Sequence, residues 1–220
     1  MKKGFILLIA LLLSVTVAIA VDPAGSSVDD IATYGPIPSP NAGNTSVNAG
    51  SIQETNLTTI MSTTKWAGIF GNVSGKIQLG DDISNIMFDW DAKGNIVYVS
   101  ENTPTWSNLS NTTASALDGN YSYLITATSE KAINTFTGSF ENIGSNLFNI
   151  NTTYASTNGP NTSIYWKTYA LTDGSNFVFA GKVQEDTKNF RNQTVDFQMI
   201  VPEDGLNSTA TIYSVWVELI

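Results

Sequence analysis

Short apolar runs separated by turn residues dominate the chain from Ile52 to Ile220. Runs rich in Thr, Val, Ile, Tyr, Phe and Trp alternate with Gly, Asn and Asp, a rhythm that is typical of β-strands. About eleven short strands with long polar connections predict an all-β fold, a single antiparallel β-sandwich or jelly-roll-like domain over residues 52–220. The expected strands are Ile52–Ile60, Lys65–Phe70, Val73–Leu79, Ile86–Trp90, Ile96–Ser100, Tyr121–Ala127, Phe136–Phe140, Ile164–Leu171, Phe177–Val183, Val195–Val201 and Thr209–Leu219.

The residues between these strands predict how the strands connect. Asp91-Ala92-Lys93-Gly94-Asn95 is expected to close a hairpin with Gly94 at a positive φ, and Asp173-Gly174 is expected to close another. One short helix is expected at Ser129–Asn134, and Asn102–Asn120 is expected to be a polar loop. No repeat of 20 to 50 residues and no Gly-rich phosphate loop occurs, which argues against repeat and nucleotide-binding classes.

The N-terminal residues have the pattern of an export signal. Lys2 and Lys3 precede an apolar stretch from Phe5 to Val17, and Ala18-Ile19-Ala20 supplies a small-x-small cleavage site. Residues 1–20 are therefore expected to be a signal peptide cleaved after Ala20, which leaves no integral membrane anchor. Residues 21–51 hold four prolines among Gly, Ser and Asn, so we expect them to form a flexible, extended N-terminal arm.

A second interpretation of the same N-terminus stays open. Lys3-Gly4 followed at once by Phe5-Ile6 resembles the processing site of archaeal type IV prepilins. Under this alternative the protein is pilin-like and keeps the Phe5–Val21 helix, which would pack into a filament core.

Charge and composition exclude several functional classes. The formal net charge is −9, and removing Lys2 and Lys3 leaves eight basic against nineteen acidic side chains, a net charge of −11. Nucleic acid is therefore not an expected partner. The chain has no cysteine and no histidine, which excludes disulfides, Ser-His-Asp triads, Cys-His nucleophiles and metal sites built on imidazole or thiolate ligands.

Carboxylate chemistry is what this composition leaves. The acids nearest aromatic residues are Glu101, Glu130, Glu141, Asp89 and Asp91. Glycoside hydrolysis needs two carboxyl groups at a fixed separation, and nothing in the sequence brings any two of these together. We therefore expect no catalytic residue and no enzymatic activity.

Sites for N-linked glycans are the most frequent chemical motif. Ten Asn-x-Ser/Thr sequons occur, none with proline in the middle, whereas random placement would give about five. They begin at Asn44, Asn56, Asn72, Asn108, Asn111, Asn120, Asn151, Asn161, Asn192 and Asn207. Together with the export signal, these sequons predict an extracellular glycoprotein of the cell surface.

Two further types of binding site were considered. The segment Asp89–Asn95 resembles a calcium loop, but Lys93 takes a ligand position and Ser100 stands where a Glu is required. Asp81 and Asp82, between two expected strands, are the remaining candidates for a structural calcium ion. No other cofactor is expected.

The five tryptophans invite a carbohydrate-binding interpretation, because flat aromatic faces stack on sugar rings. Trp66, Trp90 and Trp166 lie within expected strands and are expected to fill the core. Trp106 lies in the polar loop and is the candidate for an exposed glycan platform.

Two blocks of sequence carry a resemblance to a known family. Trp66–Leu79 reads WAGIFGNVSGKIQL, and Asp196–Pro202 reads DFQMIVP before a final run at Tyr213–Leu219. These blocks resemble a family of exported, sequon-rich archaeal cell-surface proteins of uncharacterised function. The resemblance implies secretion and glycosylation, and it implies no activity.

These observations lead to one functional hypothesis and two alternatives. The hypothesis is a secreted, N-glycosylated structural or adhesive component of an archaeal cell surface that self-associates into a filament or surface layer. Assembly is expected by strand addition, with the arm around Val28–Thr33 or Val47–Thr59 pairing with an open sheet edge of a neighbour. The alternatives are an extracellular carbohydrate-binding module, with glycans as partners, and the pilin-like protein described above.

Overall fold

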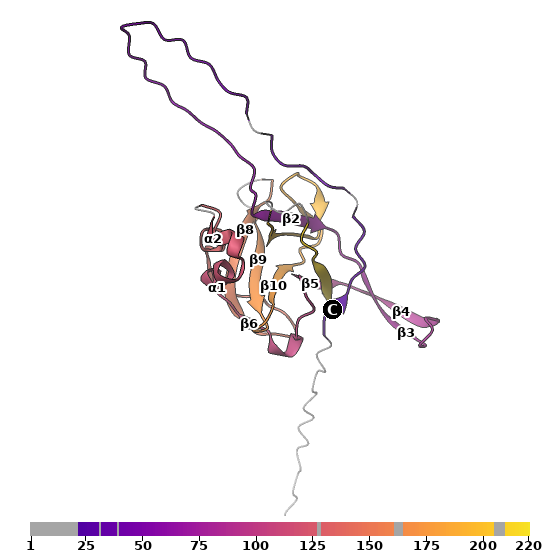
Figure 1. Cartoon of the computed structure of the whole chain (residues 1–220). Coiled ribbons are helices and arrows are strands. Elements are labelled where there is room, and N and C mark those ends of the chain that lie inside the picture. Colours follow the sequence, from indigo (N-terminus) through magenta and orange to yellow (C-terminus); the bar gives the residue numbers. More distant parts are fainter. Residues whose placement is uncertain (1–21, 31, 39, 127–128, 161–164, 205–209) are drawn as a thin grey trace, which may run out of the picture.

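The computed structural model describes residues 22–220 except 31, 39, 127–128, 161–164 and 205–209. The protein is an all-β, antiparallel, sandwich-like single domain with three short α-helices, as the sequence predicts (Figure 1). The strands are β1 Ala24–Gly25, β2 Trp66–Gly71, β3 Gly75–Gly80, β4 Ile86–Ala92, β5 Gly94–Ser100, β6 Ser110–Asn111, β7 Gly138–Asn142, β8 Asn151–Asn158, β9 Tyr165–Thr172, β10 Phe177–Lys182, β11 Thr187–Lys188, β12 Thr194–Val195, β13 Phe197–Pro202 and β14 Ser214–Leu219. The helices are η1 Trp106–Asn108, α1 Ala114–Asn120, α2 Ser122–Ile125 and α3 Ala132–Thr135.

One large antiparallel sheet organises the molecule. Its strand order is β1-β14-β5-β10-β9-β8-β7, and β6 also pairs with β9. The β9–β10 hairpin turns through Asp173-Gly174, where Gly174 has φ +94°, so this predicted turn is confirmed. The first strand, β1, adds the start of the arm to the outer edge of β14, with Ala24 opposite Val217.

Both faces of the large sheet are buried. In β5, Val97 and Val99 point into one core while Ile96 and Tyr98 point into a second core on the opposite face. A strand buried on both faces reads as a continuous apolar run instead of an alternating one, which explains the sequence of β5.

Different elements cover the two faces. The first core includes Met199 and Val201 of β13, together with Leu117 of α1 and Leu124 of α2. The second core is closed by the loop around η1, which supplies Trp106, and by the segment after β7. Helix α1 begins where the Thr113 hydroxyl accepts a hydrogen bond from the Ala116 amide, an N-cap.

Three small two-stranded sheets complete the fold. β2 pairs with β13, β11 pairs with β12, and β3 pairs with β4. The β2–β13 pair packs over the large sheet, with β13 in contact with β9 and β10. In contrast, the β3–β4 hairpin projects away from the domain (Figure 1).

Four predicted elements are wrong. Asn102–Asn120 is not a loop throughout, because it contains η1, β6 and α1. Ile52–Ile60 is not a strand but an exposed part of the arm, which therefore continues to residue 64. Tyr121–Ile125 forms the start and body of α2. No hairpin joins β4 to β5, because β4 pairs with β3 whereas β5 pairs with β10 and β14. Gly94 does not have a positive φ; a Cβ there would lie 2.6 Å from Cγ1 of Val73, so close packing requires glycine.

Candidate functional site

The sequon asparagines in the described part of the chain are all exposed. They lie in the arm, in loops and at the ends of elements: Asn44, Asn56, Asn72, Asn108, Asn111, Asn120, Asn151 and Asn192. Asn161 and Asn207 fall outside the described residues. Asn192 has φ +61° in the turn between β11 and β12, which directs the chain outward at a tight turn.

Four asparagines outside the sequons are in a different environment. Asn95, Asn142 and Asn176 are half-buried and Asn189 is fully buried, and each donates a side-chain hydrogen bond. Among the described sequons, no asparagine Nδ2 donates a hydrogen bond within the chain. Nδ2 is the atom that a glycan would modify, so these positions have both the exposure and the free nitrogen that attachment requires.

The hydroxyl residue of one sequon, by comparison, is part of the packed fold. Thr153 of the Asn151 sequon is buried, and its hydroxyl lies 3.1 Å from the carbonyl oxygens of Phe136 and Gly138. A test of glycosylation at this sequon therefore has to change Asn151 and leave Thr153 in place.

Trp106 is not an exposed platform. Its side chain is only 7% exposed and packs edge-on against Tyr98 and Trp216, at centroid distances of 5.4 and 5.5 Å. The polar neighbours of Trp106 in sequence misled the prediction, because its partners come from two distant strands. Trp166 is buried and Trp66 is half-buried, whereas Trp90, which was expected in the core, is 49% exposed.

The exposed Trp90 belongs to an apolar face of the β3–β4 hairpin. Trp90 lies opposite Ile77, and Phe88 lies opposite Leu79. The rings of Phe88 and Trp90 are 4.8 Å apart. These four side chains are about half exposed, so this face, which we call the hairpin face, has no covering partner among the described residues.

The opposite face of the hairpin is mainly polar. Lys76 lies opposite Asp91 and Gln78 lies opposite Asp89 in the register of the two strands. Lys76 Nζ donates to Asp89 at 2.6 Å, which raises the pKa of this solvent-exposed lysine. The hairpin is therefore amphipathic although both of its faces reach solvent, and an isolated two-stranded hairpin is marginally stable in water.

The two acids proposed for calcium lie at the tip of this hairpin. One oxygen of Asp81 accepts hydrogen bonds from the amides of Ile83 and Asn85, and the other accepts one from the Asn85 side chain. The Asn85 hydrogen bonds are the main reason that the pKa of Asp81 is lowered. Asp81 thus shapes the turn, and no cluster of three acidic residues suited to a metal is found in the described ranges.

One aromatic residue of the arm packs against the domain. The described residues between 26 and 64 leave β1 and return to β2 as a long loop without helix or strand (Figure 1). Tyr34 stacks on Phe70 of β2 at 6.0 Å and lies 3.9 Å from the guanidinium carbon of Arg191. Beyond this contact many apolar side chains of the arm are exposed, namely Val28, Ile37, Val47, Ile52, Leu57, Ile60 and Met61.

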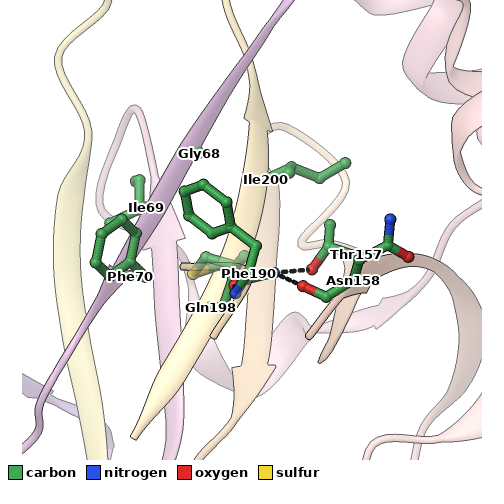
Figure 2. A pocket seen from close by; sticks show the side chains of 9 residues that line it. Gly68, Ile69, Phe70, Thr157, Asn158, Phe190, Gln198 and Ile200 are labelled. Atoms are coloured by element: carbon green, nitrogen blue, oxygen red, sulfur yellow. Dashed lines mark hydrogen bonds between the residues drawn. The ribbon is translucent and has the colours of Figure 1, made fainter. Parts of the chain in front are cut away.

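A shallow apolar groove of about 280 Å³ lies next to this contact (Figure 2). Ile69, Phe70 and Phe190 provide its apolar wall. Gln198 forms the floor, held by hydrogen bonds from its side-chain nitrogen to Thr157 and to the carbonyl of Asn158. Among the described strands β2 pairs with β13 alone, which leaves its other edge without a strand partner from that part of the chain.

The acids considered for catalysis are spread over separate elements. Glu101 follows β5, Glu130 precedes α3, and Asp89 and Asp91 lie on the hairpin. Of these acids, Glu141 of β7 has the closest contacts with cationic and hydroxyl side chains. It accepts hydrogen bonds from Lys167 at 2.5 Å and from the Tyr169 hydroxyl at 2.6 Å.

The hydrogen bond from Lys167 is the main cause that lowers the pKa of Glu141. A general acid near neutral pH needs a raised pKa, so the geometry gives Glu141 the role of an ion-pair partner.

The signal peptide, its cleavage residues Ala18 and Ala20, and the alternative Phe5–Val21 helix lie outside the described residues. None of the helices in the described part of the chain has the length and hydropathy of a membrane span. No family model, no curated protein and no solved structure matches the chain. The resemblance to archaeal surface proteins therefore remains an expectation from the sequence.

Proposed function

We propose that this protein is an exported, N-glycosylated structural subunit of a cell surface, which assembles with further copies of itself. The observation that carries the proposal is the hairpin face of β3–β4. Four half-exposed side chains, each offering on the order of 100 Å², make an apolar patch of roughly 400 Å² on a projecting element. The largest apolar patch on a soluble protein is commonly about this size and often has a function.

The partner that we assign to the hairpin face is the arm of a second copy. Both outer edges of the β3–β4 hairpin are open for strand addition, and a third strand would supply what an isolated hairpin lacks. The arm is an extended segment whose apolar side chains, such as Ile52 and Leu57, are exposed and uncovered by the described part of its own chain. One chain therefore carries both halves of the contact.

The two halves lie at different places on the molecule, which determines the form of the assembly. A contact between unlike surfaces of identical subunits is heterologous, and it propagates into a ring or a filament. The exposed sequons support an extracellular setting for this assembly, since the hairpin from Gly75 to Ala92 carries no sequon that would place a glycan on its apolar face.

The test compares two changes on opposite faces of the hairpin. Phe88→Ser with Trp90→Ser removes the apolar surface of the hairpin face, and we expect the protein to remain dispersed in sedimentation and negative-stain imaging. Gln78→Ser is the matched control, because Gln78 is exposed and lies opposite Asp89 on the polar face. Wild-type assembly of the Phe88/Trp90 variant would refute the proposed role of the hairpin.

A mixing experiment tests the identity of the partner. A variant with Ile52, Leu57 and Ile60 changed to Ser retains the hairpin face, whereas the Phe88/Trp90 variant retains the arm. A mixture of the two variants contains one intact combination of surfaces, so we expect pairs but no filaments. Filaments formed by the arm variant alone would show that the hairpin face binds something other than the arm.

A carbohydrate-binding module is the second candidate function. The exposed Phe88 and Trp90 favour it, in the place of the buried Trp106. Under this alternative, Trp90→Ala would abolish retention on a polysaccharide matrix while leaving the association state of the protein unchanged. Loss of assembly without loss of polysaccharide retention would favour the structural subunit.

A further inference from the structure

A buried lysine at the start of β2 is the most unusual charged group in the described chain. The side chain of Lys65 is only 5% exposed, and its Nζ atom has no hydrogen-bond partner among the described residues. Buried polar groups in proteins are nearly always hydrogen-bonded, and a buried ammonium without a hydrogen bond is a costly exception. The position therefore calls for a physical explanation.

One carboxylate lies close to this lysine. Asp204 follows β13, which is antiparallel to β2, and the Glu203 amide donates to the Lys65 carbonyl at 2.8 Å, so the two strand ends are held together. Oδ1 of Asp204 is 4.0 Å from Nζ of Lys65, too long for a hydrogen bond. The Asp204 side chain is 25% exposed, which gives its outer side access to water.

The surroundings of the pair are aromatic and acidic. The ring of Tyr123 lies 5.5 Å from Nζ of Lys65. Burial is the main cause that raises the pKa of Tyr123, and the negative charges of Glu101, Glu203 and Asp204 raise it further. The amine and the Asp204 carboxyl group thus meet in a partly dry site beside the Tyr123 ring.

We propose that Lys65 and Asp204 condense into an intramolecular amide bond that links the ends of β2 and β13. Transfer of one proton from the ammonium to the carboxylate gives a neutral amine and a carboxylic acid. The Nζ lone pair then adds to Cγ of Asp204, a second proton moves from Nζ to the departing hydroxyl group, the Cγ–O bond breaks and water leaves. The reaction needs no oxidant and no co-reactant.

The amide explains the features that an ion pair leaves unexplained. It removes a buried charge that has no hydrogen bond among the described residues, and it requires Nζ to move toward a carboxyl group that is already its neighbour. It also gives a cysteine-free exported chain a covalent cross-link at the sheet that carries the returning end of the arm. The observed 4.0 Å separates Nζ from Oδ1, an oxygen bonded to the Cγ atom that is attacked, and the reaction needs the side chains to move until Nζ and Cγ reach a near-attack separation of about 3–3.5 Å.

Mass spectrometry of the purified secreted protein, after removal of glycans, tests this proposal. The amide lowers the intact mass by about 18 Da, the mass of one water molecule. Trypsin does not cleave after an acylated lysine, so we expect a branched peptide. It joins the segment that runs through Lys65 to Lys76 with the C-terminal peptide that begins at Asn192.

A second lysine–carboxylate pair in the protein serves as an internal control for the cross-link. Lys93 and Glu185 form a closer ion pair, 2.8 Å, but their side chains are 69% and 52% exposed, and we expect normal cleavage after Lys93. Lys65→Met and Asp204→Ala should each restore the full mass and the unbranched peptide map. A wild-type protein with its full mass and free cleavage after Lys65 would overturn the amide, whatever its state of assembly.

Discussion

Strands β4 and β5 are separated only by Lys93, yet they lie in opposite environments. Every residue of β4 up to Asp91 is exposed, whereas β5 is fully buried from Ile96 to Ser100. The difference follows from the pattern of each strand: β5 is continuously apolar and lies inside a sheet covered on both faces, and β4 alternates apolar and acidic residues. An alternating strand has one face suited to a core, and the described chain provides no core for the apolar face of β4.

The largest difference in stability is expected between two phenylalanine-to-alanine variants, one in the core beside β5 and one on the exposed strand β4. Phe179 of β10 is fully buried beside β5, so Phe179→Ala should lower the free energy of unfolding by about 3–5 kcal/mol. Phe88→Ala on the hairpin should change it by less than about 0.5 kcal/mol in dispersed protein. Urea denaturation of both variants measures this, and equal losses would mean that the hairpin face is covered within the monomer.

A smaller effect is expected for a buried acid next to β5. Glu218 of β14 is 3% exposed and accepts hydrogen bonds from Asn95, Tyr98, Ser145 and the Asn146 amide, at 2.7–2.9 Å. Glu218→Ala leaves these donors buried without an acceptor, which should cost about 3 kcal/mol.

The exposed acid Asp91 of β4 is the control for Glu218. Asp91→Ala should leave the urea midpoint unchanged, because its carboxylate is already hydrated. A midpoint for Glu218→Ala equal to that of the wild type would contradict the structural role of the Glu218 hydrogen bonds.

The smallest effect concerns two aspartates that close turns. Burial by itself raises the pKa of Asp173, but hydrogen bonds from Thr105, Asn176 and Ser175 outweigh it and lower the pKa to about 2. A lowered pKa means that the carboxylate stabilises the fold above about pH 4 and that this contribution is lost as the pH falls toward 2.

Asp173→Asn should therefore cost about 1 kcal/mol at pH 7, allowing for solvent screening at this half-buried site, and nothing near pH 2. Denaturation curves at the two pH values measure this difference. Asp81 at the hairpin tip accepts similar bonds but is exposed, so Asp81→Asn should show a weaker pH dependence. A cost for Asp173→Asn that is the same at both pH values would exclude the carboxylate charge as its cause.

The strands with apolar or aromatic runs could be predicted from the sequence, and β8 could not. β8 reads NTTYASTN, a composition that suggests a loop. Its threonines are nevertheless buried, because the Thr152 hydroxyl donates to the Ala170 carbonyl and the Thr153 hydroxyl bonds across to the chain before β7. Such bonds depend on strands that are distant in sequence, so local pattern does not reveal them.

The candidate site was predictable only in part. The sequons are a local signal, and the exposure of those in the described ranges agrees with it. The burial of Trp106 and the exposure of Trp90 depend on whether distant strands pack against them. The residues next to each tryptophan in the sequence do not show this. The Lys65–Asp204 pair joins residues far apart in the chain and had no sequence signal.

The arm is held at both of its ends, by the pairing of β1 with β14 and of β2 with β13. A tail with a free end could extend over its whole contour length, but a loop of this kind reaches only half as far. Residues 26–65 would extend at most roughly 65 Å from the domain at about 3.3 Å per residue. In an assembly formed through the arm, the length of this loop would therefore set an upper limit on the axial repeat between neighbouring subunits.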